Sequence, residues 1–189
     1  MRPLFFILLL APLFLLGQTK NIEIEGGYGV TSIDFDGIQL IVIGGNYTIS
    51  PDKAPFYFYT GMNFSLNSAN KAYYSKVRIP IGLNFNVGDK VQFILGGGLF
   101  QSYLFAQNFL TNSYLDDVYR IQLGVTGQIG VAYELPSKVN LVLSLQTNRD
   151  LTPIFVERKW SPGGAEYDQK KYSTDLFVKA GVRFPIAKK

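Results

Sequence analysis

Apolar and polar side chains alternate with a period of two along most of the chain after residue 17. The clearest segment is 118–135, VYRIQLGVTGQIGVAYEL. Its odd-numbered positions, from Tyr119 to Leu135, are mainly large and apolar, whereas its even-numbered positions are mainly glycine, amide and charged residues. Successive side chains of a β-strand point to opposite faces, so this segment predicts a strand with one apolar and one polar face. A helix would spread the same apolar residues around its whole surface.

The same alternation recurs in seven further segments, so the pattern predicts eight strands in total. It is clear in 73–87, where Val77, Ile79 and Ile81 share a face. It is equally clear in 174–186, where Val178 and Val182 share a face. The weaker candidates are 21–30, 38–50, 54–66, 91–107 and 139–149.

The connections between the predicted strands fall into two kinds. Three are short and typical of tight hairpin turns, namely Pro51-Asp52-Lys53, Gly88-Asp89-Lys90 and Pro136-Ser137-Lys138. The longer ones lie near 31–37, 67–71, 108–117 and 152–172. Short turns at one rim and longer loops at the other are typical of transmembrane β-barrels, and an even strand count places both termini at the short-turn rim, in the periplasm.

Alternation alone leaves open which face points outward, because a soluble lipocalin-like barrel has the same period with its apolar face inside. The polar face here is rich in small polar residues with few charges, which suits a narrow lumen better than a water-exposed surface. Aromatic residues bracket the apolar runs, as in the pairs Tyr119 and Tyr133, Tyr73 and Phe85, Phe93 and Phe105, and Tyr172 and Phe184. We therefore predict an all-β fold, an eight-stranded antiparallel up-and-down transmembrane β-barrel, with a soluble barrel or sandwich as the alternative.

Residues 1–17, MRPLFFILLLAPLFLLG, predict a signal peptide that precedes a barrel domain of residues 18–189. Arg2 provides a positive start, a short apolar stretch follows, and Gly17 is a small residue before a cleavage site near Gln18. The apolar stretch is shorter than the roughly 20 residues that a transmembrane helix needs. We therefore expect export and location in the bacterial outer membrane.

The composition limits the chemistry that the protein can perform. Charged residues make up 17% of the chain, and it has no cysteine and no histidine. It therefore lacks thiolate metal ligands, the commonest metal ligand and the commonest general base. The formal charge of +4 is not gathered in a basic cluster, so nucleic-acid binding is not expected. We expect no catalytic residues, no metal site and no cofactor.

Charged residues of both signs occur on the polar faces of the predicted strands. They are Glu23, Glu25, Lys76, Arg78, Arg120, Glu134, Asp175, Lys179 and Arg183. In an eight-stranded barrel this face lines a narrow interior, where charges have to be paired. We therefore predict a structural polar network that fills the lumen, and the alternative is a polar conduit.

The longest connection, 152–172, has the most distinctive composition. It holds the only tryptophan, Trp160, beside Arg158 and Lys159. An ordered loop of this length often carries function, and an exposed aromatic ring beside charges suits binding of a protein, a glycan or lipopolysaccharide phosphates. These three residues are the candidate binding residues, and the alternative is a surface loop without a binding role.

The signal peptide, the eight strands and the closing segment DLFVKAGVRFPI resemble the PorT-like outer-membrane β-barrel domain proteins of Bacteroidetes-type bacteria. The resemblance covers the mature chain. It implies contact with outer-membrane lipid and with the barrel-insertion machinery, which in such families recognises an aromatic residue at the C-terminus. Here residues 185–189 follow Phe184, which departs from that pattern. The protein after which this family is named takes part in protein secretion and gliding.

The expected function is a non-enzymatic structural or binding role through the extracellular loops, with a lumen filled by side chains. Three alternatives stay open. They are an accessory subunit of a secretion or envelope complex, a narrow channel for small solutes, and a soluble lipocalin-like carrier.

Overall fold

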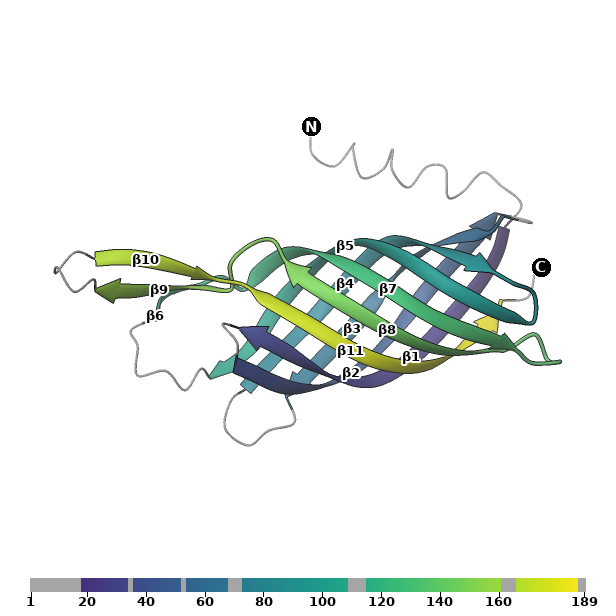
Figure 1. Ribbon diagram of the computed structural model, residues 1–189, viewed down its shortest axis with the longest axis horizontal. Coiled ribbons are helices and arrows are strands. Elements are labelled where there is room, and N and C mark those ends of the chain that lie inside the picture. Colours follow the sequence, from purple (N-terminus) through teal and green to yellow (C-terminus); the bar gives the residue numbers. More distant parts are fainter. Residues whose placement is uncertain are drawn as a thin grey trace.

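The computed structural model describes residues 18–33, 36–51, 54–67, 73–108, 115–160 and 166–186. Eight strands close into a barrel (Figure 1): β1 (Gln18–Ile33), β2 (Asp36–Pro51), β3 (Phe56–Asn67), β4 (Tyr73–Val87), β5 (Val91–Asn108), β7 (Ile121–Glu134), β8 (Asn140–Asp150) and β11 (Ser173–Pro185). Each pairs antiparallel with its neighbours in this series, and β11 pairs with β1 to close the barrel. The predicted eight-stranded up-and-down barrel is confirmed. The predicted signal peptide, 1–17, lies outside the described residues.

Two connections predicted as loops contain strands of a second, smaller sheet. Its strands are β6 (Leu115–Val118), β9 (Phe155–Trp160) and β10 (Glu166–Lys171), in the order β10-β9-β6. The prediction of plain loops at 108–117 and 152–172 is therefore wrong. The predicted strand 118–135 also begins only at Ile121, because Val118 pairs with Phe155 in the small sheet.

The barrel has two different ends. At one end β9 and β10 project beyond the barrel (Figure 1), and we call this the sheet end. At the other, the termini end, β1 begins beside the close of β11, where the Ile186 N–H donates to the Lys20 carbonyl at 2.8 Å. The loop predicted at 31–37 is mostly strand, since β1 runs to Ile33 and β2 starts at Asp36.

Large apolar side chains cover the outside of the barrel. Along β8, exposed and buried residues alternate strictly from Leu141 to Asp150. Exposed apolar residues occur on all eight barrel strands, among them Ile24, Ile43, Phe64, Ile79, Leu95, Leu123, Leu143 and Val178. This surface suits lipid, and it is the reverse of the lipocalin arrangement, in which the apolar face is inside.

Exposed aromatic rings lie near both ends of this apolar surface. Phe93, Tyr133 and Phe184 lie toward the termini end and Tyr103 and Tyr119 toward the sheet end, each at least 40% exposed. The predicted partners Tyr73 and Phe105 have side chains outside the described residues. Within the described part of the chain, no helix is long and apolar enough to cross a membrane.

Candidate functional site

Most of the polar residues predicted to line the lumen are buried inside the barrel. They are Glu23, Glu25, Lys76, Arg78, Asp175, Lys179 and Arg183, each less than 9% exposed. They sit on strands that alternate regularly, so the side chains opposite the apolar surface point inward. The described part of the lumen is therefore occupied by charged side chains.

Arg120 and Glu134 lie outside this buried network. Arg120 is exposed in the link between β6 and β7, where its Nη1 is 3.4 Å from the Tyr103 hydroxyl. The Glu134 carboxylate is at the rim of the termini end and pairs with the Lys138 ammonium at 3.0 Å. Strand alternation predicts a face only within a strand, and Arg120 precedes β7 whereas Glu134 is its last residue.

Two ion pairs near the sheet end join strands on far sides of the barrel. Arg78 on β4 pairs with Asp175 on β11, and these strands are four steps apart in the closed order of eight. The Lys76 ammonium on β4 lies 2.6 Å from the Asp150 carboxylate on β8 and 2.9 Å from the Ser173 hydroxyl. These contacts span the lumen.

Arg78 is held between two aromatic rings as well as by its ion pair. Its guanidinium carbon is 5.4 Å from the ring centroid of Phe100 and 5.7 Å from that of Phe177, within the range of cation–π attraction. The rings have room because they face glycines. A Cβ on Gly124 would overlap the Phe100 ring, and a Cβ on Gly29 would overlap the Phe177 ring.

Two further ion pairs, nearer the termini end, join the neighbouring strands β1 and β11. Lys179 pairs with Glu25, and the Arg183 guanidinium pairs with the Glu23 carboxylate at 2.7 Å. Arg183 also donates to the Tyr57 hydroxyl on β3 at 2.7 Å, and this hydroxyl accepts a bond from Asn84 Nδ2 at 2.9 Å. The four pairs contain four cations and four carboxylates, so together they carry no net charge.

An apolar cluster lies at the sheet end of the barrel. Its members are Ile33, Leu40, Val42, Leu104, Ile154, Phe155 and Phe177, and Ile38 packs against them. Ile154 and Phe155 lie in the segment that leads into β9, so the small sheet is anchored in the barrel. Backbone bonds tie the parts of the small sheet to one another. The Ile154 N–H donates to the Lys171 carbonyl on β10 at 2.7 Å, and the Ile154 carbonyl accepts from the Tyr119 N–H beside β6 at 2.8 Å.

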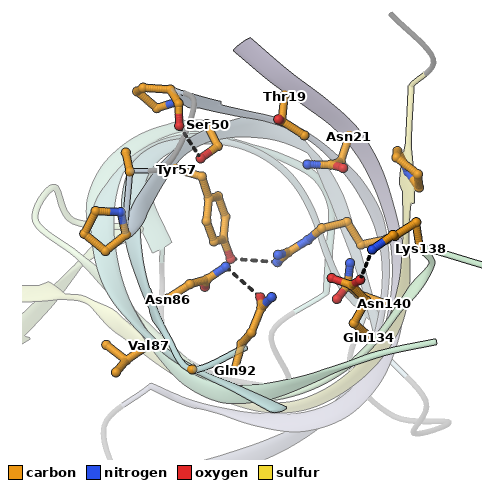
Figure 2. Close-up of a pocket in the computed structure, with 16 residues that line it drawn as sticks. Thr19, Asn21, Ser50, Tyr57, Asn86, Val87, Gln92, Glu134, Lys138 and Asn140 are labelled. Atoms are coloured by element: carbon orange, nitrogen blue, oxygen red, sulfur yellow. Dashed lines mark hydrogen bonds and ion pairs between the residues drawn. The ribbon is translucent and has the colours of Figure 1, made fainter. Parts of the chain in front are cut away.

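The termini end, by contrast, opens into a cavity of about 710 Å³, which we call the vestibule. All eight barrel strands contribute to its wall. Figure 2 shows Tyr57, Asn86 and Gln92 pointing toward the middle of the ring of strands. Arg183 and Tyr57 also line it and are hydrogen-bonded to each other at 2.7 Å.

The predicted binding residues Arg158, Lys159 and Trp160 lie on β9. Their backbone pairs with β10, in the register Asp168 with Arg158 and Glu166 with Trp160. Their side chains lie outside the described residues. The structure therefore places this segment on the small sheet and not in a loop.

The sequence did not reveal three members of the buried network. Asp150 and Ser173 end and begin strands, one residue beyond the predicted segments 139–149 and 174–186. Tyr57 belongs to a weakly alternating segment with aromatic residues on both faces. Asp150 could have been predicted, because it continues the period-two series of inward-facing positions along β8.

The sequence matches no protein-family model and no curated protein. Among solved structures, Neisserial surface protein A (NspA) is similar, with 14% identity, a TM-score of 0.66, and coverage of 90% of this chain and 99% of that chain. A major outer membrane protein from Thermus thermophilus is 11% identical, with a TM-score of 0.54 and coverage of 88% of this chain and 99% of that chain. The outer membrane enzyme PagL is 10% identical, with a TM-score of 0.51 and coverage of 87% of this chain and 99% of that chain. At these identities the likeness shows the shared fold, the closed β-barrel of small outer-membrane proteins.

Proposed function

We propose that the protein is a non-conducting outer-membrane barrel, without an active site, that holds the small sheet at the cell surface as a binding element. The observation that carries this is the set of side-chain contacts that span the lumen. Ion pairs cross the barrel between Arg78 and Asp175 and between Lys76 and Asp150, and an apolar cluster lies beside them at the sheet end.

The membrane location and its orientation are supported by the surface and by the ends of the barrel. In a closed barrel the backbone N–H and C=O groups of every strand are hydrogen-bonded to a neighbouring strand, so no strand edge is left open to lipid. The apolar exterior suits the hydrocarbon. Three of the four short connections, those between β2 and β3, β4 and β5, and β7 and β8, lie at the same end as both ends of the described barrel. Such an end is the periplasmic side of transmembrane barrels. The sheet end then faces the cell exterior.

A fold shared with an enzyme does not by itself support catalysis. The chain has no histidine, and the best nucleophile arrangement in the described residues is Ser173 beside Lys76 and Asp150. The Ser173 hydroxyl lies 2.5 Å from the Asp150 carboxylate, but all three residues are at most 3% exposed. None of them lines the vestibule or the two smaller surface cavities, and this burial supports a structural role for the Ser173 hydroxyl.

The small sheet is the best-supported binding element because it is both exposed and fixed. Ile154 and Phe155 hold it in the barrel, and Tyr167 on β10 is half exposed. A fixed element loses little conformational freedom on binding. Trp160, Arg158 and Lys159, on the neighbouring strand β9, are the residues that we expect to contact a ligand.

Conductance in planar lipid bilayers tests the proposal directly. We expect no steady current from the wild-type protein and brief openings from the double variant Arg78→Ser with Asp175→Ser, which removes one bridge across the lumen. The matched double variant Glu134→Ser with Lys138→Ser removes the pair at the rim and should stay silent. A steady open-channel current from the wild type would favour the narrow channel and overturn the proposal.

Membrane location has its own test. Cell fractionation should place the protein in the outer-membrane pellet, and the folded barrel should migrate differently on a gel before and after boiling. Recovery in the periplasmic supernatant would contradict the proposal and support a soluble carrier.

A second candidate, an accessory subunit of a secretion or envelope complex, has one observation in its favour. In the described sheet, β10 pairs with β9 on one side only, and such an edge can accept a strand from a protein partner. This function also agrees with the PorT-like resemblance. Gentle solubilisation should then yield a larger complex with the wild type and not with Tyr167→Pro, because a proline on β10 removes an N–H and disrupts the edge. Isolation of the wild type as a free monomer would count against it.

A further inference from the structure

The vestibule lies at the opposite end of the barrel from the small sheet and is not explained by a surface-binding role. Its volume of about 710 Å³ falls within the roughly 300–1,000 Å³ typical of small-molecule sites. Eight strands hold its wall. Two of its lining residues, Arg183 and Tyr57, are hydrogen-bonded to each other, and Tyr57 also accepts a bond from Asn84 behind the wall. It is therefore a preformed pocket on a scaffold of paired strands.

The charges around the vestibule are already paired within the protein. Among the described residues that line it, the charged ones are Glu134, Lys138 and Arg183. Glu134 and Lys138 pair with each other at 3.0 Å, and Arg183 pairs with Glu23 at 2.7 Å. A neutral ligand therefore fits the pocket without breaking an ion pair of the protein.

The remaining wall is built from amides and hydroxyls beside small apolar surfaces. Asn21, Asn86, Gln92 and Asn140 contribute amides, and Thr19 and Ser50 contribute hydroxyls. Asn86 Nδ2 donates to Gln92 Oε1 at 3.0 Å, and Gln92 Nε2 donates to the Asp89 carbonyl at 3.2 Å (Figure 2). An amide nitrogen has two N–H groups, so each of these bonds leaves the second N–H of its amide for a ligand.

Apolar surface is supplied at the same rim by Pro51, Pro55, Val87 and Pro185. A sugar ring has hydroxyls at its edge and C–H groups on its faces, and it matches a wall of amides interspersed with apolar patches. A peptide that binds by adding a strand to a sheet has no free edge here, because every barrel strand is paired on both sides.

We propose that the vestibule is a binding site for a neutral sugar, either free or within a glycan chain, on the periplasmic side of the barrel. The side of the membrane rests on the orientation proposed above. Sugar binding itself is measured on purified protein, so its failure is distinguishable from failure of the fractionation or conductance tests.

The first experiment titrates two neutral probes, diacetylchitobiose and maltotriose, into the refolded full-length mature chain in nanodiscs. Detergents with sugar headgroups are avoided because they would occupy the same site. Calorimetry or saturation-transfer NMR should show saturable binding of at least one probe. Absence of saturable binding with both probes would overturn the proposal.

Gln92→Leu should weaken binding of that probe about fivefold to tenfold, because it removes hydrogen bonds from the wall. The matched control is Gln39→Leu, the same change at an exposed position near the sheet end, which should leave affinity unchanged. Equal affinity of Gln92→Leu and the wild type would place the sugar elsewhere and contradict the proposal.

A second variant keeps the test valid if Gln92→Leu does not fold. The chain has no cysteine, so Thr19→Cys offers a unique thiol at an exposed position on the vestibule wall. A bulky maleimide attached after folding should abolish sugar binding, whereas the same label on Gln39→Cys should not. Unchanged binding after labelling of Thr19→Cys would contradict the proposal.

Sedimentation with purified peptidoglycan separates the sources of the sugar. Co-sedimentation that diacetylchitobiose competes away would identify a glycan strand, and binding of the soluble probes alone would identify a free saccharide. Both outcomes support the site. Co-sedimentation without any binding of the sugar probes would point to the peptide part of the polymer and overturn the proposal.

Discussion

The two halves of the lumen use the same kinds of residues in different arrangements. Toward the sheet end, Lys76 and Arg78 on β4 reach carboxylates on β8 and β11, across the barrel. Toward the termini end, the cations on β11 pair with Glu23 and Glu25 on the adjacent β1. One half contains an apolar cluster, and the other opens into the vestibule.

The comparison shows that the effect of a buried ion pair depends on whether its two residues lie on opposite or on adjacent strands. A pair between opposite walls occupies the axis of the barrel and excludes water. A pair between adjacent strands lies along one wall and leaves space beside it. Removal of one residue of an ion pair should therefore lower the free energy of unfolding most where no water can reach the remaining charge. Four variants should show a graded series of such losses.

Arg78→Ala should have the largest effect. It leaves Asp175 buried without its cation, and we expect the free energy of unfolding in lipid vesicles to fall by about 3–5 kcal/mol. Urea titration followed by circular dichroism measures this. The double variant Arg78→Met with Asp175→Leu is the control and should recover most of the loss, because it leaves no unpaired charge. A single-variant loss below about 1 kcal/mol would break the comparison.

Ile154→Ala should come next, with a loss of about 3 kcal/mol, because it leaves a cavity in the apolar cluster. Ile154 is 0% exposed. Leu151→Ala is its matched control in the same connection, since Leu151 is 58% exposed and should change the same urea midpoint little. Equal effects of the two variants would show that the cluster does not anchor the small sheet.

Glu23→Gln tests the other half of the lumen and should cost about 2 kcal/mol, the scale of one charged hydrogen bond. The loss should be smaller than for Arg78→Ala, because Arg183 keeps its bond to Tyr57 and borders the open vestibule. Urea titrations of both variants under identical conditions decide this. A loss equal to or above that of Arg78→Ala would remove the distinction between the halves.

Lys138→Ala should have the smallest effect, at most about 1 kcal/mol, because exposed ion pairs contribute little. The Lys138 side chain is 76% exposed and its partner Glu134 is at the rim. The same titration in low and high salt should differ little from that of the wild type. A large loss would indicate that the rim is held more firmly than its exposure suggests.

The sequence alone determined the strands, the two faces and the barrel, because strand periodicity is local. Segment 73–87 was predicted with the bounds that β4 has in the structure, and the charges of Glu23, Arg78 and Lys179 were assigned to the lumen from alternation alone. Arg120 was misplaced because the strand that would have turned it inward begins at Ile121.

The tertiary structure decided which charges meet, because pairing across a lumen depends on closure and register. Nothing local links Arg78 to Asp175, which are 97 positions apart in the chain, or brings Asp150 beside Lys76. The small sheet was also invisible to periodicity, since β6 has four residues and β9 has six, too few to show a repeat. The vestibule exists only where eight strand ends meet, and no single segment encodes it.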